Sequence, residues 1–181
     1  MTHTLTLRPI KYNDVFGGGI MKESIYLETT VVSYYTSKSS RDIIVLAHHE
    51  ITREWWGKAL KRYDIFISEI VIEEAGAGDS DAARKRLEIL KGFSHLELNH
   101  TVEKMAQVYV EKLKIPQKAL RDAVHLAVAS VHSVDYLVTW NCAHIANGEV
   151  IKKLLQINTS FGITTPVICT PEELMPTMKG D

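Results

Sequence analysis

The feature that most constrains the fold is a regular alternation of short apolar runs with segments of helical periodicity. Buried strands are expected at 24–28, 65–68, 95–98, 135–140 and 167–169, and the segments between them carry apolar residues at helical spacing. This alternation is typical of β-α-β units, in which helices cover both faces of a parallel sheet. We therefore predict a three-layer α/β/α fold, in which the central layer is a parallel sheet of about five strands.

Helix boundaries are predicted from capping residues. Thr101 precedes a segment with Val102, Met105 and Tyr109 on one face, so it is expected to cap a helix there. Near the end of the chain, Thr170 is followed by Pro171 and by glutamates at 172 and 173. That order combines an N-cap, a proline at the first helical position and a capping-box acid, and it predicts a further helix.

Composition limits the function. The 181 residues are 45% apolar and 24% charged with a formal net charge of −1, which excludes a disordered chain and a basic protein that coats nucleic acid non-specifically. An RNA substrate would then need a local site or a metal to supply the attraction. No apolar run reaches the roughly 18–20 residues of a membrane span, and two cysteines form no zinc or disulfide pattern. We expect a cytoplasmic protein.

The first twenty residues differ from the rest of the chain. A triple glycine at 17–19 comes just before Met21, where the dense pattern begins. We expect residues 1–20 to be a flexible N-terminal extension, 21–175 to be one domain and 176–181 to be a C-terminal tail. One interpretation is that Met21 is the natural start and that residues 1–20 come from a misassigned upstream start. The other is an ordinary extension that pairs with a sheet edge.

Acidic and amide side chains follow the predicted strands. Glu28 ends the first strand, Glu74 lies in the helix after the second, Asp122 opens the helix before the fourth, and Asn141 follows the fourth. The carboxyl ends of parallel strands share one edge of a sheet, so these groups should converge there. A divalent cation such as Mg²⁺ or Mn²⁺ would relieve their repulsion. Alternatively, each acid is a helix cap or a surface charge, and Asn141 caps the next helix.

Two further groups near these positions have more than one interpretation. His125, one helical turn after Asp122, is expected either to hydrogen-bond that carboxylate or to be a satisfied histidine near the core. Arg84, Lys85 and Arg86, together with Lys91, form the densest basic cluster. Such a cluster is usually a solvated helix face, but beside an acidic site it could hold phosphates.

Four segments give the sequence a family resemblance between about Met21 and Leu174. They are Ile25-Tyr26-Leu27-Glu28-Thr29-Thr30-Val31, Ser68-Glu69-Ile70-Val71-Ile72-Glu73-Glu74, Arg121-Asp122-Ala123-Val124-His125-Leu126-Ala127 and Tyr136-Leu137-Val138-Thr139-Trp140-Asn141. The chain resembles PIN-domain proteins of the VapC toxin type, and the aspartate followed by His-Leu-Ala is the most specific segment.

This resemblance implies a PIN-like fold and a metal-dependent endoribonuclease, the toxin of a type II toxin-antitoxin system. It implies an RNA substrate, a cognate antitoxin and a homodimer. The implied site is Glu28, Glu74, Asp122 and Asn141, with Mg²⁺ or Mn²⁺ held by the three carboxylates. Glu73 competes with Glu74, and we select Glu74 because its spacing from Ser68 matches the family better.

Two positions depart from the family pattern. Glu28 stands where aspartate is usual, and Asn141 stands where aspartate is frequent. The site therefore has one formal negative charge fewer than a site with four acidic residues, which implies weaker metal binding or a shift toward Mn²⁺. The alternative function is a catalytically weak or inactive PIN-like module that binds RNA or protein. For a partner interface, the sequence offers an apolar set that could equally be core: Tyr34, Tyr35, Ile44, Ile51 and Trp55.

Overall fold

The computed structural model describes residues 22–175. The predicted N-terminal extension and C-terminal tail lie outside these residues. Five parallel strands form one sheet in the order β3-β2-β1-β4-β5. The strands are β1 (Ser24–Leu27), β2 (Asp64–Ser68), β3 (Ser94–Leu96), β4 (Tyr136–Val138) and β5 (Val167–Cys169). The predicted α/β class, the parallel sheet and all five strands are confirmed.

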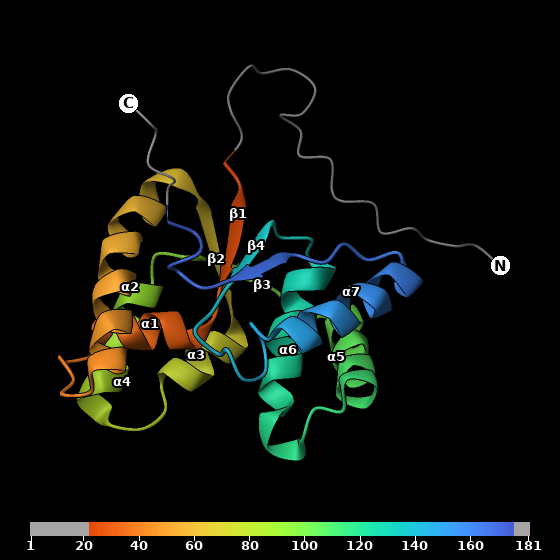
Figure 1. Ribbon diagram of the computed structural model, residues 1–181, viewed down its shortest axis with the longest axis horizontal. Coiled ribbons are helices and arrows are strands. Elements are labelled where there is room, and N and C mark those ends of the chain that lie inside the picture. Colours follow the sequence, from red (N-terminus) through yellow and green to blue (C-terminus); the bar gives the residue numbers. More distant parts are fainter. Residues whose placement is uncertain (1–21, 176–181) are drawn as a thin grey trace.

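Helices cover both faces of this sheet, as Figure 1 shows. One layer holds α1 (Thr29–Thr36), α2 (Ile43–Arg62), α3 (Glu69–Ala75) and α4 (Ser80–Leu90). The other holds α5 (His100–Leu113), α6 (Leu120–Val131), which follows a short 3₁₀ turn (Gln117–Ala119), and α7 (Gly148–Phe161). This division follows from right-handed crossovers, because the chain moves outward from β1 to β3 and then returns through β4 to β5. None of the helices in the described part of the chain has the length and apolar character needed to cross a membrane.

The strand order creates a switch point between β1 and β4. The chain leaves β1 toward one edge of the sheet and leaves β4 toward the other, so the connections diverge at the carboxyl ends of these two strands. Open α/β sheets bind ligands at such points, because the diverging loops leave a crevice there. Every residue of β1 is buried, which makes it the centre of the core.

Two predicted helix starts differ from the structure. Asn99 caps α5 through hydrogen bonds from the backbone N–H groups of Thr101 and Val102, so Thr101 lies inside the helix. Thr170 and Glu173 form the reciprocal capping-box hydrogen bonds, yet the described residues that follow make only a turn. The capping signal was correct and the predicted helix was wrong. Pro176 follows within one turn, and proline disfavours a helical conformation in the residue before it.

Candidate active site at the carboxyl edge of the sheet

Glu28 is held at the end of β1 by hydrogen bonds on both carboxylate oxygens. The backbone N–H of Thr30 donates to Oε1 at 3.1 Å, and the hydroxyls of Thr30 and Thr139 both donate to Oε2. The first of these contacts makes Glu28 the N-cap of α1. Its side chain is only 3% exposed. Such burial is tolerated because each oxygen has a donor. Glu28 therefore combines a capping role with a place at the candidate site.

Glu74 reaches the same place from α3. The hydroxyl of Thr29 donates to its Oε2, and Nε2 of His125 lies 3.0 Å from the same oxygen. The neighbouring Glu73 points outward, is 56% exposed and pairs with Arg121 at 3.2 Å. Arg121 also lies 3.8 Å from Oε1 of Glu74. The geometry thus brings Glu74, rather than Glu73, to the sheet edge.

Asp122 and Asn141 form a separate pair beside these acids. Nδ2 of Asn141 donates to Oδ1 of Asp122 at 3.0 Å, while Oδ1 of Asn141 accepts from the backbone N–H of His144 at 3.1 Å. The side chain of Asn141 therefore caps the turn after β4 and also orients Asp122. The predicted cap of the next helix by Asn141 is wrong, because α7 is capped by Asn147 and Asn141 caps only this turn.

The carboxyl groups of Glu74 and Asp122 are shifted in opposite directions. Burial acts to raise the pKa of Glu74, but the hydrogen bond from His125, the Thr29 hydroxyl and Arg121 outweigh it and hold that pKa below its usual value. Burial raises the pKa of Asp122, and the charge of His144 and the Asn141 hydrogen bond offset this only in part. Opposed shifts of neighbouring carboxyls are frequent at functional sites.

The side chains fit a divalent cation. Ligand atoms of Glu28, Glu74 and His125 lie within 4.8 Å of one another. Carboxylate oxygens suit Mg²⁺ and Mn²⁺. Asp122 is not in this group, but the charge of Glu74 acts to raise its pKa, so it belongs to the same electrostatic environment.

The groups that orient these acids were missed or left open by sequence reasoning. Tyr26 was predicted only as part of a buried strand and of a family segment, and Ser68 only as a strand end and the start of another such segment. In the structure the Tyr26 hydroxyl contacts Ser68 at 2.6 Å and Nδ1 of His125 at 2.9 Å. The signal available was a tyrosine in a fully buried strand, since a buried phenol needs a hydrogen-bond partner.

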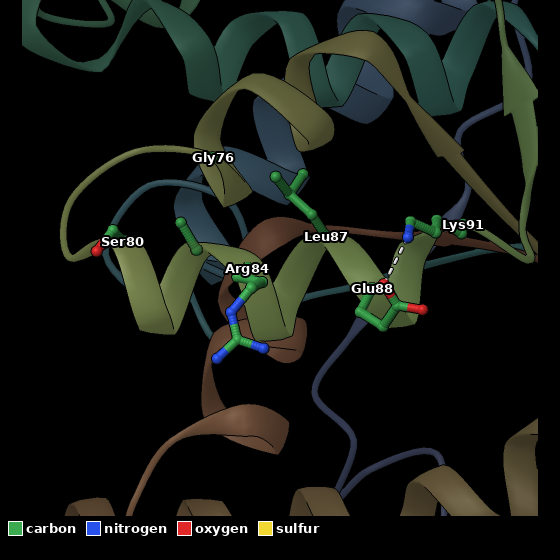
Figure 2. Close-up of a pocket in the computed structure, with 7 residues that line it drawn as sticks. Gly76, Ser80, Arg84, Leu87, Glu88 and Lys91 are labelled. Carbon is green, nitrogen blue, oxygen red and sulfur yellow. Dashed lines mark hydrogen bonds and ion pairs between the residues drawn. The ribbon is translucent and has the colours of Figure 1, made fainter.

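The basic cluster does not line the acidic site. Figure 2 shows a groove between the end of α3 and α4, bordered by Arg84, Glu88 and Lys91 among others. Arg84 pairs with Asp81, Lys91 pairs with Glu88, and Arg86 donates to backbone carbonyls at the end of α3. These three side chains therefore pair with neighbouring acids or backbone carbonyls, as on an ordinary solvated helix face.

The apolar set considered for an interface divides between surface and core. Trp55 is 1% exposed and belongs to the core, and Tyr35 stacks on Trp56 with ring centroids 4.3 Å apart. Ile44 is 67% exposed at the beginning of α2. Core packing therefore explains Trp55, and an interface at this end of the domain could use Ile44.

Comparisons with known proteins agree with this architecture. Residues 25–141 match the PIN domain family. VapBC2 from Rickettsia felis, solved bound to a DNA fragment from its promoter, superposes with a TM-score of 0.53 at 14% identity, covering 81% of this chain and 98% of that chain. Mycobacterium tuberculosis VapC20, described as a sarcin-ricin loop cleaving toxin, gives a TM-score of 0.50 at 14% identity, covering 62% and 86%. No curated protein matches the chain by sequence.

The family match spans more than half of the chain and includes all four candidate site positions. The chain therefore belongs to the PIN domain family. The two solved structures share its fold, and both are VapC-type proteins.

Proposed function

We propose that this protein is a metal-dependent endoribonuclease, the VapC-type toxin of a type II toxin-antitoxin pair. The observation that carries the proposal is the cluster of Glu28, Glu74 and His125 at the switch point of a PIN-domain sheet, with Asp122 in the same electrostatic environment. Membership of the PIN family and the VapC-type structural neighbours support the choice of RNA as substrate and of a phosphodiester as the bond that is cleaved.

Glu28, Glu74 and Asp122 would hold Mg²⁺ or Mn²⁺. When bound, such a cation would polarise the scissile phosphodiester and lower the pKa of the attacking water. The chain itself keeps the carboxylates aimed and charged: threonine hydroxyls hold Glu28, His125 holds Glu74, and Asn141 holds Asp122. Arg121 is about half exposed beside Glu74, where its guanidinium can donate hydrogen bonds to a phosphate.

The adjacent glutamates provide a matched test. Glu74→Gln should abolish cleavage of structured RNAs in Mn²⁺ or Mg²⁺, because it removes a ligand. Glu73→Gln makes the same chemical change one residue away, on an exposed side chain, and should leave cleavage within about twofold. Equal loss in both variants, or none in either, would contradict the assigned site.

A second candidate function, a PIN-like module that binds without cutting, is favoured by one observation. Both oxygens of Glu28 already have protein donors, so this carboxylate can bind a cation only by giving up some of these contacts. Thermal unfolding with and without Mn²⁺ separates the two functions, because a cation bound only by the native state raises the melting temperature. A melting temperature independent of Mn²⁺, together with intact RNA, would favour the module.

We also propose an antitoxin partner and a homodimer. Support comes from the VapC-type structural neighbours and from exposed apolar side chains at the start of α2, where Ile43 and Ile44 are 81% and 67% exposed. Size-exclusion chromatography with light scattering, with and without the protein encoded beside this one, tests both. A monomer at every concentration would contradict the homodimer.

A further inference from the structure

A buried chain of hydrogen bonds leads from the core to the candidate site. It begins at Ser68, passes through the hydroxyl of Tyr26 and the ring of His125, and ends at Oε2 of Glu74, with contacts of 2.6, 2.9 and 3.0 Å. Ser68, Tyr26 and His125 are at most 1% exposed. Burial of this depth requires each polar group to have a partner, and the chain supplies them.

The chemistry of its last member sets the direction of the chain. An ionised carboxylate can only accept, so Nε2 of His125 must donate to Glu74. In a neutral imidazole the other nitrogen, Nδ1, is then an acceptor, and it takes the hydroxyl proton of Tyr26. The oxygen of Tyr26 in turn accepts from Ser68. All protons point the same way, toward Glu74.

We infer that His125 is a positioning residue, oriented by Tyr26 and Ser68 with its Nε2–H toward Glu74, that fixes the orientation of Glu74 for a cation. This inference rests on the proposed function. Oε2 of Glu74 receives both His125 and Thr29, while Oε1 has only the longer contact of 3.8 Å with Arg121. Oε1 is therefore the oxygen presented to a ligand. Partners that orient ligating carboxylates in this way tune metal affinity.

The test removes one hydroxyl. Tyr26→Phe keeps the aromatic ring and deletes the donor to Nδ1 of His125. Tyr109→Phe is the matched control, because Tyr109 is also fully buried and its hydroxyl donates to Asn158, between α5 and α7. Ser68→Ala, at the buried end of the hydrogen-bond series, is a milder second variant. It tests the same series should Tyr26→Phe fail to fold.

Two measurements are made on the full-length protein. The ¹⁵N chemical shifts of the metal-free protein, labelled at histidine, report which nitrogen of His125 carries the proton. Titration with Mn²⁺, followed by the EPR signal of the free ion, reports affinity. We expect the Nε2–H tautomer in the unaltered protein, a shifted Nδ1 resonance in Tyr26→Phe because that nitrogen loses its hydroxyl donor, and about a tenfold weaker Mn²⁺ affinity in the same variant. Ser68→Ala should give a smaller change in the same direction, and Tyr109→Phe none.

Four outcomes would overturn the inference. A proton on Nδ1 of His125 in the unaltered protein would contradict the direction assigned to the hydrogen bonds between Ser68 and Glu74. Unchanged Mn²⁺ affinity in both Tyr26→Phe and Ser68→Ala, with binding intact in the parent, would remove the positioning role and leave the proposed function standing. Equal weakening by Tyr26→Phe and Tyr109→Phe would show general destabilisation. Absence of Mn²⁺ binding by the unaltered protein would contradict the proposed function as well.

Discussion

Two buried polar clusters in this domain are each built around a tyrosine, and they end differently. Tyr109 of α5 donates to Asn158 of α7, which in turn donates to Ser130 of α6 and to Thr165. All four are neutral and satisfy one another. The chain from Ser68 through Tyr26 instead ends on the charged Glu74, which is 22% exposed at the sheet edge. The closed neutral cluster stabilises the packing of the helices against one another. The series of hydrogen bonds that ends on Glu74 instead orients a carboxylate toward a ligand.

The largest expected effect is on the charged cluster. Asp122→Asn should lower RNA cleavage by at least about 100-fold, because loss of a direct ligand should exceed the loss of an orienting partner. The measurement is the initial cleavage rate in saturating Mn²⁺. Asp81→Asn, on an exposed side chain of α4, is the control and should cut at the parent rate. A fully active Asp122→Asn protein would remove Asp122 from the site.

The next effect is on the neutral cluster. Asn158→Ala removes the buried amide that hydrogen-bonds to both Tyr109 and Ser130, and we expect the free energy of unfolding to fall by about 3 kcal/mol. In a chain of this size the melting temperature should drop by roughly 6–12 °C. Mn²⁺ affinity, measured well below that temperature, should be unchanged. Weaker Mn²⁺ binding in this variant would show that the two clusters are coupled.

A smaller effect concerns stability and pH. Burial raises the pKa of Asp122 in the native state. The contribution of Asp122 to folding stability is therefore fully present below its pKa in the unfolded state, and it is lost as pH rises through its pKa in the folded state. Asp122→Asn has no such loss and should be the more stable protein at neutral pH without metal. The difference should shrink as pH falls and disappear below about 4, where the unfolded aspartate also becomes protonated. Denaturant unfolding across this pH range measures it.

A difference that stayed constant with pH would exclude ionisation of Asp122 as its cause. Added Mn²⁺ should reverse the order of stability, because only the parent keeps the ligand.

The elements of the fold were predictable because periodicity depends on which faces of a segment are buried. β1 is buried on both faces and reads as a continuous apolar run, which identifies it as a central parallel strand. The same run conceals Tyr26, because its sequence pattern reports burial and not which partner the hydroxyl finds. The choice of Glu74 over Glu73 came from the family resemblance, because its spacing from Ser68 matches the family better. The contact between Glu74 and His125 joins α3 to α6, and no local spacing encodes it.

The smallest expected effect concerns Asn141. Asn141→Asp replaces the amide that donates to Asp122 with a second carboxylate, while an aspartate oxygen can still accept from the backbone N–H of His144. Raw attraction of about 4 kcal/mol per charge pair at 4 Å and an effective dielectric of 20 is largely cancelled by desolvation, so we expect only a few-fold tighter Mn²⁺ binding and more cleavage at low metal. Asn147→Asp makes the same change at the cap of α7, where it should leave the titration unchanged. If Asn141→Asp also leaves it unchanged, Asn141 serves the site only by orienting Asp122, and the cation depends on the three carboxylates alone.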